Sequence, residues 1–165
     1  MDDLGGGGAL KMGAVTCVLP VSAARCFELL EDPRALRLLV AGAREIRHFD
    51  PRWPDPGTTI DHSVGIQPLV IRDRTEVVMC EPGQRLLLHA RVQLFGSFSV
   101  DFRISPHPEG SELTVEEHAT GGLAGLPGLK VAADAAVILR NRWLCRRFRQ
   151  LVDKREDNAA RVGDG

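Results

Sequence analysis

Residues 98–104 alternate between apolar and polar side chains without a break: Phe98-Ser99-Val100-Asp101-Phe102-Arg103-Ile104. This period of two indicates a β-strand with one buried face and one face in water. The alternation recurs through most of residues 57–119, and about 129–155 then follow the helical period. Because a one-sided antiparallel sheet has to pack its apolar face against another element, we expect the final helix to cover the sheet.

The pattern predicts an α+β fold, with a curved seven-stranded antiparallel sheet, a long C-terminal helix and two short helices after the first strand. Ser22 is an expected N-cap for the first short helix, and Asp32-Pro33 is a start signal for the second. Short turns such as Glu81-Pro82-Gly83 make successive strands antiparallel neighbours. The predicted strands are 14–19, 46–49, 58–66, 69–80, 84–95, 97–105 and 111–120.

The length, hydrophobic content and net charge of the chain are those of a single globular domain with almost no net charge. The chain has 165 residues, 44% of them hydrophobic, and a formal net charge of −1. This charge gives no reason to expect nucleic acid or an anionic membrane as a partner, and no apolar run reaches the ~20 residues of an integral membrane segment. The predicted domain boundaries are a disordered tail at 1–12, a folded domain at 13–156 and a second tail at 157–165.

The cysteines and glycines bear on cofactors and location. Cys17, Cys26, Cys80 and Cys145 are scattered and form no Cys-x-x-Cys pair, which predicts reduced thiols in a cytoplasmic protein and no metal site. No glycine motif lies between a strand and a helix in the way that nucleotide binding requires. We therefore expect no cofactor.

Several polar side chains are predicted to lie among apolar ones. Counting by twos places His62, Asp73 and Glu117 in register with apolar neighbours on their strands. At about 100° per residue, the final helix turns Asn141 and Asp134 to the same side as its apolar residues.

Unpaired buried polar groups are costly, so this convergence is better explained by the wall of a ligand cavity than by a solid core. The predicted cavity residues besides Asn141 and Asp134 are Ile60, Val64, Ile71, Leu88, Val92, Phe98, Val100, Phe102, Val115, Val137, Leu144 and Phe148.

The polar set suits acid–base chemistry on a ligand carbonyl. His62 is the candidate base that removes an α-proton, and Asp73 or Glu117 is the candidate acid or the group that orients the imidazole. Asn141 is a candidate hydrogen-bond partner for a carbonyl or an enolate. No metal takes part in this scheme.

These residues also have structural interpretations. His62 and Asp73 can pair with each other or with arginines at the sheet edge, and Asp134 can interact with the dipole at the start of the final helix. A β-bulge would exchange the directions of Glu116 and Glu117, so the sequence leaves open which of them points inward.

A family resemblance adds to this interpretation. The phrases that carry it are 19–24 (LPVSAA), 27–33 (FELLEDP), 57–60 (GTTI), 76–78 (EVV), 81–86 (EPGQRL), 110–117 (GSELTVEE), His62-Ser63-Val64-Gly65 and Arg140-Asn141. Together with the element order, they resemble the START-related helix-grip (SRPBCC) superfamily of polyketide cyclases/dehydrases and lipid-transport proteins, in particular single-domain bacterial members. The resemblance covers about 14–155 and implies an apolar ligand cavity. Because this chain has no tyrosine, the tyrosines that line several aromatase cavities of the superfamily have no counterpart.

Three functions are weighed from these observations. The first is binding of an apolar polyketide- or lipid-like molecule by a cofactor-free polyketide cyclase/dehydratase, through aldol cyclisation or dehydration. The second is binding of such a ligand by a non-catalytic carrier or sensor. The third is a protein-interaction module that uses Trp143, which the helical period places away from the sheet. The protein is expected to be a monomer or a homodimer, and the arginines within 140–149 are interpreted as a solvated helix face.

Overall fold

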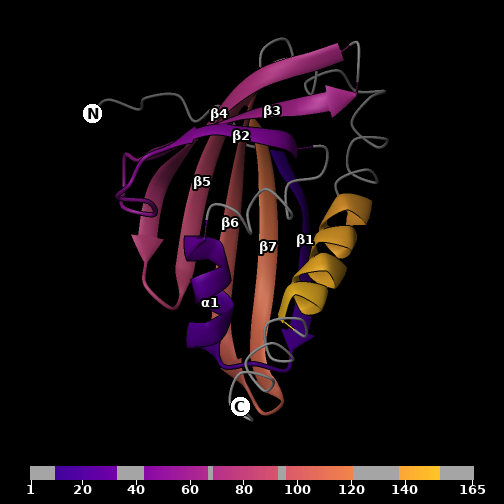
Figure 1. The fold of residues 1–165 in the computed structure, drawn as a ribbon. Coiled ribbons are helices and arrows are strands. Elements are labelled where there is room, and N and C mark those ends of the chain that lie inside the picture. Colours follow the sequence, from indigo (N-terminus) through magenta and orange to yellow (C-terminus); the bar gives the residue numbers. More distant parts are fainter. Residues whose placement is uncertain (1–9, 33–42, 67–68, 93–95, 121–137, 153–165) are drawn as a thin grey trace, which may run out of the picture.

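One antiparallel sheet organises the molecule (Figure 1). The structure is a computed structural model that describes residues 10–32, 43–66, 69–92, 96–120 and 138–152. The strand order is β1-β7-β6-β5-β4-β3-β2, so each strand from β2 to β7 lies beside its neighbour in the chain and β1 closes the far edge. The strands are β1 (Leu10–Leu19), β2 (Ala43–Phe49), β3 (Thr59–Ile66), β4 (Leu69–Glu81), β5 (Arg85–Val92), β6 (Gly96–His107) and β7 (Gly110–Thr120).

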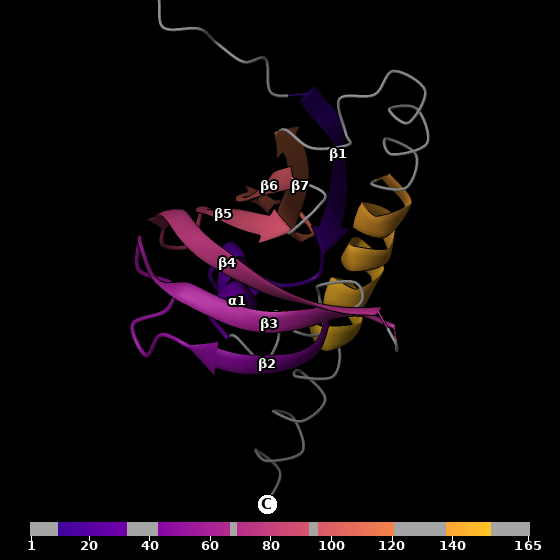
Figure 2. The same ribbon diagram turned by 90° about the horizontal axis from the view of Figure 1, so that it is seen from above.

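Two helices accompany the sheet within the residues that the structure describes. α1 (Ala23–Glu31) packs against β6 and β7, and the Oγ of Ser22 accepts a hydrogen bond from the backbone N–H of Arg25 at 3.3 Å, which confirms the predicted N-cap. The second helix is described over 138–152 and lies beside β1 in both views (Figures 1 and 2). Arg149 fastens it there, because its Nη2 donates to the carbonyl oxygen of Val18 at 2.6 Å.

The predicted strands are all present, with differences at their ends. β1 begins at Leu10 rather than at Ala14, because Leu10, Lys11 and Met12 pair with β7. The first strand therefore includes the end of the segment that was expected to be a disordered tail. The second short helix, expected to begin at Asp32-Pro33, and the tail at 157–165 lie outside the described residues.

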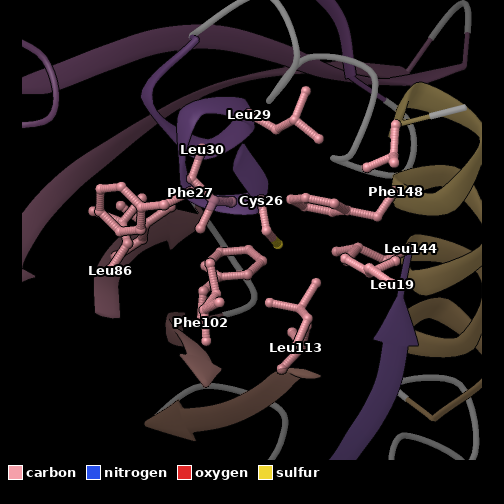
Figure 3. Packing of buried hydrophobic residues seen from close by; sticks show 14 of the residues in the cluster. Leu19, Cys26, Phe27, Leu29, Leu30, Leu86, Phe102, Leu113, Leu144 and Phe148 are labelled. Carbon is pink, nitrogen blue, oxygen red and sulfur yellow. The ribbon is translucent and has the colours of Figure 1, made fainter. Parts of the chain in front are cut away.

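The hydrophobic core lies between α1, the inner face of β5–β7 and the helix over 138–152 (Figure 3). This helix contributes Leu144, Phe148 and Val152, which confirms that its apolar side faces the sheet. The other core residues labelled in Figure 3 are Leu19, Cys26, Phe27, Leu29, Leu30, Leu86, Phe102 and Leu113.

A glycine allows the β6–β7 turn to approach the chain that leads into α1. Gly110 has a φ of +132°, in the region that favours glycine, and a Cβ on it would collide with the backbone of Leu19 and Val21. The close approach brings the ends of β1 and β7 together at the position where α1 begins.

Two leucines on one helix test whether the helix over 138–152 is held by its inner face. Leu144 is 4% exposed and Leu139 is 65% exposed. We expect Leu144→Ala to lower the free energy of unfolding by about 2–5 kcal/mol, because it removes buried methyl groups and leaves a cavity. Leu139→Ala, the matched control, should change it by less than about 0.5 kcal/mol. Urea unfolding followed by circular dichroism measures both, and equal losses would contradict the packing described.

Candidate functional site

Four polar side chains that were predicted to face the core are buried. The exposed fractions are 6% for His62, 6% for Asp73, 1% for Glu117 and 0% for Asn141. The fifth predicted residue, Asp134, lies outside the described residues. These four side chains therefore face the interior, as the alternation along β3, β4 and β7 and the helical period after residue 137 predict.

His62 and Asp73 form a buried pair across two strands. They are directly opposite in the β3–β4 register, and His62 Nε2 lies 3.6 Å from Asp73 Oδ2. Burial raises the pKa of the Asp73 carboxyl, although the backbone N–H of Arg74, which donates to Oδ1 at 2.7 Å, and the neighbouring His62 both act to lower it. A carboxyl in this position can orient the imidazole and can carry a proton.

Glu117 forms an ion pair with the C-terminal helix. Its Oε1 accepts from Nη2 of Arg140, and the Arg140 Nε is buried without a hydrogen-bond partner in the part of the chain that the structure describes. Burial lowers the pKa of Arg140. The helical wheel predicts a solvated Arg140; the side chain is 40% exposed, but its guanidinium is bound to Glu117 and its Nε is buried. A long side chain on the flank of the helix reaches back to the sheet, where a buried carboxylate needs a cation.

The neighbouring glutamate points the other way. Glu116 Oε2 lies 3.3 Å from Arg103 Nη1, and Glu116 Oε1 lies 3.7 Å from His118 Nε2. The alternative that the sequence left open is thereby resolved, because Glu117 faces the helix and Glu116 faces the outer side of the sheet.

Asn141 is the least satisfied of the four polar residues. Its side chain is completely buried, and neither Oδ1 nor Nδ2 makes a hydrogen bond with the described residues. An orphaned buried amide destabilises a fold by about 1–3 kcal/mol, and such groups are rare in native proteins. Asn141 follows Arg140 directly, so the unpaired amide and the unpaired Nε come from adjacent residues.

The apolar residues predicted to line a cavity occupy three kinds of position. Ile60, Leu88, Phe102, Val115, Leu144 and Phe148 belong to one packed hydrophobic cluster. Phe98 and Val100 are half-buried. The side chains of Val64, Ile71 and Val92, and the whole of Val137, lie outside the described residues. Their contact with a ligand stays a prediction.

A hollow of about 280 Å³ lies on the other face of the sheet. It is lined by Gly57, Thr59, Arg74, Glu76, His89 and Arg91. In the sheet register these strand residues alternate with the buried ones, so the hollow is on the outer side, away from the polar residues described above. Arg74 is already bound to Asp61, with Nε 2.7 Å from Oδ1.

The outer face also buries a carboxylate, which the sequence did not predict. Asp101 belongs to the polar side of the alternating strand, yet it is only 2% exposed. Arg85 donates to both its oxygens at 2.9 Å and Arg103 donates to Oδ2 at 2.6 Å. Although burial acts to raise it, these hydrogen bonds hold the pKa of Asp101 below its usual range. The expectation of a solvated Asp101 is wrong because arginines on β5 and β6 cover it.

Comparisons with known proteins identify the fold. No protein-family model and no curated protein matches the chain. Ara h 8.0201 is a structural match with 14% identity and a TM-score of 0.69, over 89% of this chain and 99% of that one. The di-domain ARO/CYC StfQ from the steffimycin biosynthetic pathway matches with 13% identity and a TM-score of 0.70, over 88% of this chain and 51% of that one. The chain has the helix-grip fold.

A third match carries no functional information. The protein of unknown function SA2116 from Staphylococcus aureus is 7% identical, with a TM-score of 0.72 over 91% of this chain and 97% of that one. At such identities the similarity shows the helix-grip fold alone. In residues 10–32, 43–66, 69–92, 96–120 and 138–152, no helix is long and apolar enough to cross a membrane. Within the same ranges, no three His, Cys, Asp or Glu side chains gather as metal ligands would.

Two aspartates on neighbouring strands should give opposite pH effects on stability. Burial raises the pKa of Asp73 in the folded protein, whereas in the unfolded chain this carboxyl loses its proton near pH 3.9. Between these two pKa values the folded protein binds a proton that the unfolded chain does not, so the free energy of unfolding falls as pH rises. The hydrogen bond from Arg74 lowers the Asp61 pKa, so stability rises with pH as the unfolded chain loses its proton.

Urea unfolding at several pH values above about 3 measures both effects. Relative to Asp73→Asn, the unmodified protein should lose stability as pH rises. Relative to Asp61→Asn, it should gain stability. The same sign for both aspartates would show that Asp73 is not a desolvated carboxyl.

Proposed function

We propose that the protein binds an apolar small molecule, polyketide- or lipid-like, in an internal cavity between the sheet and the helix over 138–152. The observation that supports this most directly is Asn141, whose buried amide has no partner among the described residues. An apolar side chain at this position would avoid the energetic cost of the unpaired amide. A ligand that supplies the missing hydrogen bonds explains why an amide is present.

The unused polar atoms specify the chemistry of the ligand. Asn141 offers two donors and one acceptor, and the Nε of Arg140 offers one further donor. Donors therefore outnumber acceptors, which favours a ligand with an oxygen acceptor such as a carbonyl. The hydrophobic cluster around Phe102 and Phe148 suits an apolar remainder. We therefore assign the ligand to apolar molecules that carry at least one ketone or similar oxygen.

The structural matches are compatible with this assignment. StfQ is an ARO/CYC from a biosynthetic pathway, and the present chain matches 51% of it. The shared fold adds a precedent for small-molecule chemistry in a related architecture. The assignment to this chain depends on Asn141 and its neighbours rather than on the match.

The His62–Asp73 pair favours a second candidate function, a cofactor-free cyclase/dehydratase. His62 takes an α-proton from the bound ketone, and Asp73 orients the imidazole or returns a proton. Asn141 Nδ2 stabilises the developing enolate oxygen. We assign Glu117 to positioning Arg140 rather than to acid catalysis, because its Oε1 already accepts a hydrogen bond from Arg140 Nη2. A carrier or sensor would bind the same ligand without the proton transfer.

Replacement of the unpaired amide tests the binding proposal. Asn141→Leu should raise the free energy of unfolding by about 1–3 kcal/mol, because it replaces an unsatisfied buried amide with an apolar side chain of similar size. It should also abolish the preference for a ketone over its hydrocarbon analogue. The ligands are 2-acetylnaphthalene and 2-ethylnaphthalene, and we expect the unmodified protein to prefer the ketone by roughly three- to tenfold in Kd.

Fluorescence titration gives both dissociation constants, and urea unfolding gives the stability. Gln150→Leu is the matched control, since Gln150 is exposed on the same helix and its change should leave the ligand preference intact. A destabilised Asn141→Leu protein that still prefers the ketone would mean that Asn141 has a structural role, and the proposal would be wrong.

Hydrogen exchange at the ligand separates an enzyme from a carrier. In D2O, a general base beside a bound ketone exchanges the α-protons of 2-acetylnaphthalene for deuterium through an enolate. We expect the unmodified protein to accelerate this exchange over buffer, and His62→Gln to lower the rate by roughly 10²-fold or more while Kd changes little. Mass spectrometry of the recovered ketone measures the rate. A bound ketone that exchanges no faster than in buffer would identify a carrier.

A further inference from the structure

The outward side of the helix over 138–152 has a composition that ligand binding does not explain. This stretch contains five arginines and no acidic residue, in a chain whose formal net charge is −1. The helix lies at the rim of the molecule beside β1, and only one of its sides is turned to the sheet (Figure 2). Its positive charge is therefore a local feature that the overall composition conceals.

Two of the arginines have structural partners inside the protein. Arg140 binds Glu117, and Arg149 donates to the carbonyl of Val18. Arg142 and Arg146 are exposed and make no hydrogen bond or ion pair with the described residues. Their charges are not needed to hold the helix on the sheet.

Two large apolar side chains lie next to these arginines on the same side of the helix. Leu139 is 65% exposed and Trp143 is 43% exposed, which confirms that Trp143 points away from the sheet. At about 100° per residue, Leu139, Arg142, Trp143 and Arg146 fall within about 100° of arc on one side of the helix. We call these four residues the outer helix face.

We propose that the outer helix face docks the protein on an anionic lipid surface. Tryptophan is favoured at the boundary between lipid headgroups and acyl chains, and arginine binds lipid phosphate while its stem stays in an apolar layer. Leu139, an aliphatic side chain, fits acyl chains, whereas it offers no stacking surface to a nucleic acid base. A second copy of this chain would bring like charges together, which disfavours self-association through this face.

The proposed docking is weak and reversible, because few side chains take part in it. Only two unpaired arginines and two apolar side chains form the contact, so the affinity depends on negative lipid and falls as salt screens the charges. The same helix carries Asn141 on its opposite, buried side. The docking itself does not depend on the proposed ligand site.

Tryptophan fluorescence can detect the docking directly. The chain has two tryptophans, and Trp53 is buried with its Nε1 donating to the carbonyl of Leu30 at 3.2 Å. A change in emission on adding vesicles therefore reports Trp143. The vesicles are phosphatidylglycerol mixed with phosphatidylcholine, and pure phosphatidylcholine serves as the uncharged comparison.

We expect a blue shift with the anionic vesicles, at least about tenfold tighter association than with pure phosphatidylcholine, and loss of most binding at high salt. Trp143→Phe should remove the shift. Arg142→Gln combined with Arg146→Gln should weaken vesicle co-sedimentation by roughly tenfold or more. The matched control is Arg72→Gln with Arg91→Gln, exposed arginines on the sheet, and it should bind within about twofold of the unmodified protein.

Three results would overturn the proposal. The first is equal association with charged and uncharged vesicles. The second is equal weakening by the outer-face and sheet-face arginine pairs, which would indicate bulk charge. The third is absence of vesicle binding together with a dimer, or a complex with an acidic protein, that Trp143→Ala disrupts. Circular dichroism of each variant confirms that the fold is intact.

Discussion

The orientation of the helix over 138–152 about its own axis determines which of its side chains face the core and which face solvent. Two interactions set that orientation. Leu144, Phe148 and Val152 pack into the core, and Arg140 binds the buried carboxylate of Glu117. With the helix fixed in this way, the next residue after Arg140 has to face the core. Asn141 is therefore placed in a hydrophobic interior without a partner among the described residues, and the outer helix face is turned to solvent.

Buried polar side chains on the two faces of the sheet differ in how completely they are paired. On the outer face, arginines on β5 and β6 bind Asp101 and Glu116. On the inner face, Glu117 has its arginine, but His62 and Asp73 have a separation of 3.6 Å and Asn141 has no hydrogen bond within the described residues. A buried polar group without a partner calls for an explanation, and on the inner face we propose that a bound ligand supplies it. This contrast is the physical reason for assigning function to the inner face.

The sequence predicted the features that depend on local periodicity. Alternation of apolar and polar residues was enough to predict seven strands, and the same counting placed His62, Asp73 and Glu117 on the buried face. Features that depend on distant residues were missed. The start of β1 is extended by pairing with β7, a strand that lies about a hundred residues later in the chain. Arg140 and Asp101 were assigned to solvent because no local pattern shows that a long arginine side chain will reach a carboxylate on another element.

The central claim is that the side-chain amide of Asn141 donates a hydrogen bond to an oxygen of the ligand. Nuclear magnetic resonance of the Asn141 side-chain amide tests it most directly. Addition of 2-acetylnaphthalene should shift both Nδ2 protons and slow their exchange with water, and addition of 2-ethylnaphthalene should leave them nearly unchanged. If neither compound affects this amide while both perturb residues elsewhere on the protein, Asn141 is not a ligand-binding residue and the account of the inner face is wrong.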